Sequence, residues 1–377
     1  MIFNARILVV CIVLLIFSRG TNAQTVNPTV QLSYDFRNGA LGWEPGFGDY
    51  SPQSGLDIYE LRSEIRQLPP EIGSGTGFFF QGQNRSDDLF MFLKRRLTPA
   101  DGIVAGQRYE INYTIVLASS ACSDCTGAGG HPGFNVYLKA GAAPIEPIPY
   151  GPFQRLNVDM GAQSQGGIAA SVAGDIANGL PYNPEPPFVS LTRTHRHTTR
   201  VTASSSGELW LLVGTDSGFE GLTQLFYQRI DVTLVPVGPS PLPLKPPPAL
   251  LTEEKTGLVV ALNAVNLTRE PFSWFTRPNY GDSEQTRVSL FATGIDLLPG
   301  EDASAVSAVI EDSQQRLMQV PVEFVGKVPN FDLFTQIVVR LPFPIIREGT
   351  KIRIGLRGAS SNSAPFNYRQ DNLGLSQ

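Results

Sequence analysis

Residues 109–118 read Tyr-Glu-Ile-Asn-Tyr-Thr-Ile-Val-Leu-Ala, and up to Thr114 their side chains alternate between apolar or aromatic and polar. A period of two places every second side chain on the same face of a strand. It is therefore typical of a β-strand with one buried face and is unlike the spacing of an amphipathic helix. This segment predicts that the chain is built around β-sheet.

Similar short runs, separated by Gly, Pro, Asn and Asp, recur on both sides of this segment. Those before residue 237 are 78–80, 89–93, 134–140, 200–203, 209–213 and 225–236. Those after it are 258–263, 286–293, 305–311, 320–325, 335–341 and 351–356. Many short strands divided by turn-forming residues predict an all-β chain of sandwich type. Residues 56–67 are the exception, because Ile58, Leu61 and Ile65 are spaced as in one short helix.

Composition agrees with a folded β protein. The sequence is 42% hydrophobic and 10% aromatic but only 17% charged, with 37 glycines and 30 prolines. The apolar residues are enough to form hydrophobic cores, and the glycines and prolines suit turns. This composition favours strands over helices. The formal net charge of −5 argues against broad electrostatic binding of nucleic acid.

The first residues predict export. Arg6 precedes the apolar run 7–17, and the small residues Thr21 and Ala23 suit a signal peptidase, so residues 1–23 are interpreted as a signal peptide cleaved after Ala23. The run is too short to span a bilayer, and no later segment is apolar for about 18 residues. We expect a secreted, extracellular or cell-surface protein with no membrane span after cleavage.

A proline-rich stretch divides the remaining chain. Seven of the thirteen residues from Pro236 to Pro248 are proline, which favours an extended spacer over a paired strand. We predict a first sandwich domain over 24–236, a linker over 237–254 and a smaller immunoglobulin-like sandwich over 255–377. Few contacts are expected to cross the spacer, so the halves are predicted to fold independently.

The cysteines offer two readings. Cys11 leaves with the signal, and the remaining pair is Cys122 and Cys125 in Cys-Ser-Asp-Cys. After export a local disulfide is expected. A zinc site is the alternative, but it needs four ligands and only His131 is nearby.

The ends of the first domain resemble carbohydrate-binding jelly rolls. The resemblance rests on Tyr34-Asp35-Phe36 with Gly42-Trp43, and on the closing segments 207–219 and 227–232. It implies a jelly-roll fold and a carbohydrate ligand. Calcium, which such modules often hold, is possible here, but the usual acidic pairs are not clearly matched.

Two further stretches resemble secreted bacterial proteins. Residues 155–161, 165–167 and 174–179 resemble an uncharacterised family of such proteins, and 287–342 resemble a C-terminal β-sandwich found in them. The first resemblance implies no known activity, and the second implies a structural or adhesive module.

The loop Leu41–Tyr50 is the leading candidate for a ligand site. It places Trp43, Phe47, Asp49 and Tyr50 among glycines and a proline. Aromatic faces can cover the apolar face of a sugar while carboxylates accept its hydroxyl hydrogen bonds. Trp43 and Tyr50 are therefore expected to be exposed, and the alternative is that Trp43 is a core residue at the end of the sandwich. Trp210, Trp274 and Tyr182 are further aromatic candidates, with Trp210 expected in the core.

No motif marks an enzyme. The sequence lacks a Gly-x-Ser-x-Gly nucleophile elbow, and no spacing singles out a hydrolytic carboxylate pair from Glu60, Glu64, Asp87, Asp88, Asp159 and Asp175. His195 and His197 share a strand face and could reach one metal ion, but no third ligand is identifiable. We therefore expect no catalytic residues and a secreted, non-enzymatic binding protein that binds a carbohydrate or acts in adhesion. The alternatives are a glycan hydrolase with an unrecognised site and a structural cell-surface protein.

Overall fold

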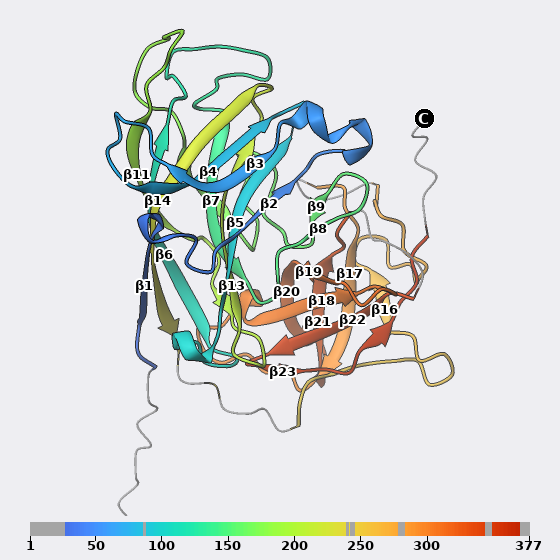
Figure 1. Cartoon of the computed structure of the whole chain (residues 1–377). Coiled ribbons are helices and arrows are strands. Elements are labelled where there is room, and N and C mark those ends of the chain that lie inside the picture. Colours follow the sequence, from blue (N-terminus) through green and yellow to red (C-terminus); the bar gives the residue numbers. More distant parts are fainter. Residues whose placement is uncertain are drawn as a thin grey trace, which may run out of the picture.

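The computed structural model describes residues 27–85, 88–238, 241, 246–277, 283–343 and 349–369. Over these residues the elements are strands and short 3₁₀ turns, so the all-β prediction is confirmed (Figure 1). The predicted signal peptide, and positions 239–240 and 242–245 of the linker, lie outside the described residues.

The first half is a sandwich of two antiparallel sheets. One sheet contains β1 (Val30–Asp35), β3 (Arg62–Gln67), β4 (Thr76–Gln83), β6 (Arg108–Ser119), β11 (Val189–Arg196), β12 (Val201–Thr202) and β14 (Leu222–Val237). The other contains β2 (Glu44–Gly48), β5 (Leu89–Leu97), β7 (Val136–Ala143), β10 (Ser171–Asp175) and β13 (Leu209–Ser217). From β4 to β7 the chain crosses from one sheet to the other at each step, as in a jelly roll.

The alternating segment that begins at Tyr109 lies in β6, where it pairs with both β11 and β14. Tyr109, Ile111, Tyr113 and Ile115 point into the core between the sheets and are at most 2% exposed. The intervening side chains are only partly buried up to Val116. The period-two pattern therefore indicates which face of β6 is buried between the two sheets.

β5 is apolar without alternation because both of its faces are covered. Leu89, Met91 and Leu93 belong to the core between the sheets, whereas Phe90 and Phe92 belong to a second cluster on the outer face. That outer cluster is closed by the segment 144–170, which contributes Leu156, Val158 and Met160 among others. A continuous apolar run is the expected signature of such a strand.

The helix predicted over residues 56–67 is wrong. Leu56–Tyr59 form one 3₁₀ turn that ends at Glu60, whose φ of 48° is left-handed. Residues Arg62–Gln67 form β3 instead, paired with β4. A long-range ladder with β4 thus overrides the local helical spacing, as tertiary context often does.

The second half is a smaller pair of antiparallel sheets. One contains β15 (Ala249–Leu250), β16 (Ala261–Asn263), β17 (Arg287–Thr293), β20 (Val322–Val328) and β21 (Phe331–Arg340), and the other contains β18 (Val306–Glu311), β19 (Leu317–Val320), β22 (Lys351–Leu356), β23 (Ala359–Ser360) and β24 (Ala364–Pro365). The segment predicted as one strand over 320–325 is divided at Pro321, which has no N–H for a ladder. The immunoglobulin-like assignment and the domain boundaries stay predictions.

The expectation that few contacts join the halves is wrong. Tyr150, on the short β8 (Pro149–Tyr150), packs in the core cluster of the second sandwich. The Asn157 side chain donates to the carbonyl of Leu317 at 2.8 Å, and its own carbonyl accepts from the N–H of Gln319 at 2.8 Å. The segment 144–170 makes these contacts because it leaves the first sandwich as a long excursion between β7 and β10, which the proline count could not reveal.

Candidate ligand-binding sites

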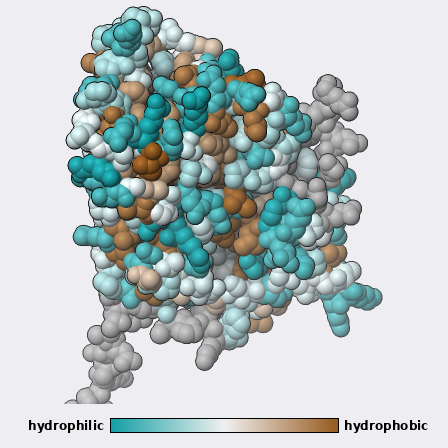
Figure 2. All heavy atoms as spheres, in the orientation of Figure 1, coloured by the Kyte–Doolittle hydropathy of each residue, from teal (hydrophilic) through white to brown (hydrophobic). Residues whose placement is uncertain are grey.

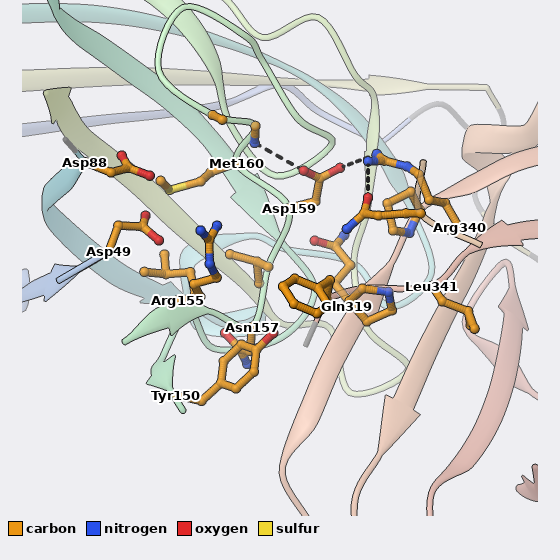
Figure 3. A pocket seen from close by; sticks show the side chains of 18 residues that line it. Asp49, Asp88, Tyr150, Arg155, Asn157, Asp159, Met160, Gln319, Arg340 and Leu341 are labelled. Carbon is orange, nitrogen blue, oxygen red and sulfur yellow. Dashed lines mark hydrogen bonds and ion pairs between the residues drawn. The ribbon is translucent and has the colours of Figure 1, made fainter. Parts of the chain in front are cut away.

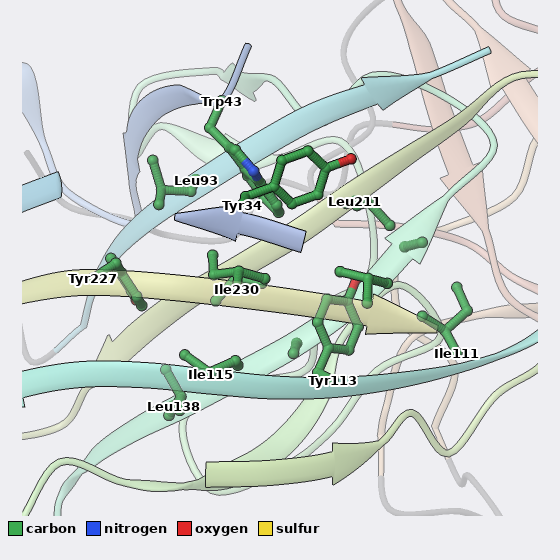
Figure 4. Close-up of a cluster of buried hydrophobic side chains, with 14 of the residues drawn as sticks. Tyr34, Trp43, Leu93, Ile111, Tyr113, Ile115, Leu138, Leu211, Tyr227 and Ile230 are labelled. Carbon is green, nitrogen blue, oxygen red and sulfur yellow. The ribbon is translucent and has the colours of Figure 1, made fainter. Parts of the chain in front are cut away.

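Trp43 is a core residue, so its expected exposure is wrong. It is 2% exposed, and its ring meets that of Tyr34 edge to face at a centroid distance of 5.5 Å (Figure 4). A second edge-to-face contact joins it to Phe36 at 6.5 Å. Leu41 and Gly42 take left-handed φ values of 52° and 78° just before it. This tight turn directs the indole between the sheets, as in the core alternative.

The other residues of the predicted loop site have separate environments. Phe47 packs on Phe80, and Tyr50 packs on Tyr59, with centroid distances of 5.7 and 5.3 Å. Both rings are half-buried rather than exposed. The expected exposure of Tyr50 is therefore wrong, and the loop presents no aromatic platform. Of the four predicted site residues, Trp43, Phe47, Asp49 and Tyr50, Asp49 is the one that lines a cavity.

That cavity, which we call the interdomain pocket, lies between the two sandwiches and has a volume of about 230 Å³ (Figure 3). Asp49 and Asp88 line one side, residues 155–162 form the floor, and the second sandwich closes it with Gln319 and 340–343. Burial raises the pKa of Asp49 to about 7, and the nearby Asp216 carboxylate adds to the effect. Burial and the same carboxylate raise the pKa of Asp88 to about 9.

A fully buried ion pair lies behind the two carboxyl groups. Lys139 Nζ is 2.7 Å from Asp216 Oδ2, and neither side chain is exposed. The same ammonium donates to the carbonyls of Met160 and Gly161 at 3.0 and 3.2 Å, and Asp216 also accepts from the N–H of Gln163 at 2.9 Å. This pair therefore fixes the loop that forms the floor of the interdomain pocket.

A second, larger groove of about 660 Å³ runs along the loop that carries the two cysteines. Cys122 and Cys125 form a disulfide with a Cα–Cα distance of 5.8 Å, which confirms the predicted pairing. We call this cavity the disulfide-loop groove. Its walls combine apolar and polar side chains: Pro132, Tyr182, Pro184, Pro186, Phe219 and Leu222 with Asp124, Asn183, Thr223 and Gln224.

Tyr182 is the prominent aromatic side chain of the disulfide-loop groove, with 71% of its surface exposed. Its backbone N–H donates to Asp124 Oδ1 at 2.6 Å, inside the disulfide loop. The same loop holds the preceding residues, because Gly179 N–H donates to Ser123 Oγ and Ser123 N–H donates to the Leu180 carbonyl. The disulfide loop thus positions the segment that presents Tyr182.

Two further features shape the disulfide-loop groove. A Cβ at Gly127 would stand 2.7 Å from the Phe219 ring, so glycine is needed for this ring to lie against the loop. Thr223 is 4% exposed, and its Oγ1 has no hydrogen-bond partner among the described residues. A buried hydroxyl without a partner is uncommon.

His195 and His197 do lie on one face, as the sequence predicts, but they share a serine. Ser171 Oγ is 2.8 Å from His195 Nε2 and 2.8 Å from His197 Nδ1. Burial lowers the pKa of His197 to about 4, and its Nε2 lies 3.1 Å from the carbonyl of Ile168. These contacts join the half-buried His195 and the buried His197 in one polar network around Ser171.

Metal and membrane features give no further site. Among the described residues no group of three or more His, Cys, Asp or Glu side chains is arranged to hold a metal ion. No helix in the described part of the chain is long and apolar enough to cross a bilayer. Hydrophilic and hydrophobic residues are interspersed over both sandwiches on the face shown in Figure 2.

Comparison with known proteins gives distant structural similarity only. No protein family and no curated protein matches the sequence. The carbohydrate-binding module TmCBM61, solved with β-1,4-galactotriose, is 8% identical, and the match covers 52% of this chain and 92% of that one at a TM-score of 0.25. The K3 adhesin domain of Lys-gingipain from Porphyromonas gingivalis is 12% identical over 54% of this chain and 98% of that one, with a TM-score of 0.25. The adhesin domain of Epf from Streptococcus pyogenes is 8% identical over 92% and 99%, with a TM-score of 0.23. Similarities at this level do not assign a ligand.

Proposed function

We propose that this chain is a secreted, non-enzymatic protein that binds an extracellular carbohydrate in the disulfide-loop groove. The observation that carries the proposal is the position of Tyr182, a largely exposed aromatic ring held over a groove with polar walls. The apolar face of a sugar can lie against such a ring, while Asp124, Asn183 and Gln224 offer hydrogen-bonding groups to its hydroxyls.

The size and rigidity of the disulfide-loop groove support binding. Its volume of about 660 Å³ falls within the range common for small-molecule sites. The disulfide and the hydrogen bonds from Tyr182 and Gly179 order the groove before any ligand arrives. A preformed site loses less conformational entropy on binding, which favours affinity.

Secretion is part of the proposal and rests on two observations. The first 23 residues have the pattern of a signal peptide. The disulfide between Cys122 and Cys125 is of a kind that persists in oxidising compartments. Both observations fit an exported chain.

Glycan hydrolysis is the rival at the interdomain pocket, where Asp49 and Asp88 lie together. Hydrolysis needs one carboxyl group protonated and a second ionised as base or nucleophile. Burial raises the pKa of Asp49 to about 7 and that of Asp88 to about 9. Both groups therefore favour the neutral form below about pH 7, so the pair has no ionised member to act as base or nucleophile in mildly acidic solution.

The test is a glycan array with the full exported chain, followed by calorimetry on the glycans that bind. Tyr182→Ala should weaken binding about five-fold, because one stacked ring contributes about 1 kcal/mol, whereas Tyr182→Phe should retain it. Phe331→Ala is the matched control, because Phe331 is 60% exposed on the second sandwich. Unchanged affinity in Tyr182→Ala, or no bound glycan, would contradict the proposal.

A further inference from the structure

Arg155 differs from the other arginine of the interdomain pocket. It lies on β9 (Arg155–Leu156), its side chain is exposed, and it makes no hydrogen bond or ion pair to any described residue. Arg340, by contrast, contacts Asp159 at 3.1 Å, Glu323 at 3.0 Å and Gln285 at 2.9 Å. Only the guanidinium of Arg155 therefore has its donors available to a ligand in this pocket.

The position of Arg155 is fixed by its backbone. β9 pairs with β8, and the register places Arg155 opposite Tyr150, which is anchored in the second core. Figure 3 shows the Arg155 side chain directed toward the region between Asp49 and Met160. The guanidinium is thus held where both sandwiches contribute to the wall.

The groups around Arg155 do not neutralise it. The opposite charges of Lys139 and Asp216 neutralise each other behind the pocket wall, where Lys139 Nζ lies 2.7 Å from Asp216 Oδ2. Burial keeps Asp49 and Asp88 in the neutral form up to raised pKa values, about 7 and about 9. In mildly acidic solution the pocket therefore contains the positive charge of Arg155 beside two neutral carboxyl groups, of which that of Asp88 is hydrogen-bonded to Asp216.

We propose that the interdomain pocket is a second binding site, which takes the carboxylate of a small acidic ligand on Arg155. A planar carboxylate matches the fork of a guanidinium and can accept two parallel hydrogen bonds from it. Because the Asp49 and Asp88 carboxyl groups are neutral in mildly acidic solution, they do not repel the same anion. This site is separate from the disulfide-loop groove and does not depend on the function proposed there.

The size and walls of the pocket narrow the ligand class. About 230 Å³ is less than most drug-sized sites, so the ligand is one ring or smaller. Leu156, Val158 and Met160 give the floor an apolar part, whereas Asn157 and Gln319 are polar. A single acidic sugar, such as a uronic acid, combines a carboxylate with the hydroxyls and apolar ring face that these walls suit.

The experiment is calorimetric titration of the full chain with galacturonate, with galactose as the neutral analogue and inorganic sulfate as a non-planar anion. In buffer of about pH 5.5 galacturonate should bind at least about ten-fold more tightly than galactose, because a charge-assisted bidentate pair exceeds a neutral contact. Arg155→Gln should abolish that preference, and Arg155→Lys should retain part of it. Arg62→Gln, an exposed arginine on β3, is the control and should change nothing.

Three outcomes would overturn the assignment. Equal affinity for galactose, unchanged binding in Arg155→Gln, or sulfate binding as tight as galacturonate binding would each remove the carboxylate site.

Thermal melting of Arg155→Gln separates a loss of binding from a loss of the fold. Tyr182→Ala should leave galacturonate binding intact, so failure here is distinguishable from failure at the disulfide-loop groove. Binding should also weaken near pH 8.5, where ionised Asp49 competes for Arg155.

Discussion

Lys139 and Asp216 form an ion pair of 2.7 Å between two side chains that have no exposed surface. The two residues lie on the neighbouring strands β7 and β13, where Lys139 stands opposite Gly214 and Asp216 opposite Tyr137. The pair also holds the loop of Met160 and Gly161 through the lysine ammonium. It therefore joins the first sandwich to the floor of the interdomain pocket.

Lys139→Met should destabilise the protein strongly, because Asp216 would keep a buried carboxylate without its partner. Breaking a buried pair in this way typically costs about 3–5 kcal/mol. The double variant Lys139→Met with Asp216→Leu should recover most of this loss, since no charge is left buried. Urea denaturation of the two single variants and the double variant measures the coupling. Additive losses in the double variant would contradict this account.

The pH dependence of stability should show the buried carboxyl groups of the interdomain pocket. Burial raises the pKa of Asp49 to about 7 and of Asp88 to about 9, above the ordinary value of 3.8. At pH values between the ordinary carboxyl pKa and the raised pKa of each group, the folded state binds more protons than the unfolded state. The contribution of the two neutral carboxyl groups to the stability of the fold therefore falls as the pH rises. It is fully present below the ordinary carboxyl pKa and is lost progressively up to about pH 9.

The measurement is a series of thermal melts from about pH 5 to about pH 9 on the native chain, Asp49→Asn and Asp88→Asn. Each asparagine variant should flatten the decline, because it cannot ionise. Asp296→Asn provides the control, since its carboxylate is exposed and paired with Lys327 on the surface. An unchanged slope in both pocket variants would show that these groups ionise as ordinary carboxylates.

Trp43→Ala should reduce stability by about 3–5 kcal/mol, the usual cost of removing a large buried aromatic side chain. The reason is its place beside Tyr34 and Phe36 in the core between the sheets. Trp43→Phe should lose much less, because a ring remains in the cavity. Chemical denaturation measures both, and Phe153→Ala, at 53% exposed, is the matched surface control. A near-native midpoint for Trp43→Ala would restore the exposed-loop interpretation.

The sequence predicted features that depend on local pattern. The alternation in β6, the apolar run in β5 and the pairing of Cys122 with Cys125 each follow from neighbouring residues, and the structure has all three. The 3.6-residue spacing near Ile58 failed because β4 supplied a partner strand from outside the window. Local spacing cannot register such a partner.

The sites depended on distant residues and were missed for that reason. Trp43 resembled an exposed loop residue, since glycines and a proline surround it, and only the sheet packing shows the indole enclosed. The wall of the interdomain pocket joins Asp49, Arg155 and Arg340, which no sequence window contains. Tyr182 is the exception, because it is one of the aromatic candidates named from the sequence, and Pro181-Tyr-Asn-Pro184 is a turn-rich context in which an aromatic ring is hard to bury.

The final prediction concerns cooperation between the sandwiches. We expect the full chain to unfold in one calorimetric transition, although the proline-rich spacer alone would predict two. Tyr150 belongs to the first half by sequence but packs in the core of the second, and Asn157 bonds to both Leu317 and Gln319. Arg108, whose side chain is 6% exposed, donates a hydrogen bond of 2.7 Å to the hydroxyl oxygen of Ser304 in the second half.

These contacts bury a large side chain and satisfy backbone groups of the opposite half, so one sandwich should not melt while the other keeps its native surface. Tyr150→Ala should loosen the joint and split the heat-capacity peak into two, or broaden it, with the second sandwich melting first because it loses a core ring. Phe153→Ala, in the same excursion but 53% exposed, should leave one peak. Two resolved peaks in the unmodified chain would show instead that the contacts across the joint are too weak to couple the halves.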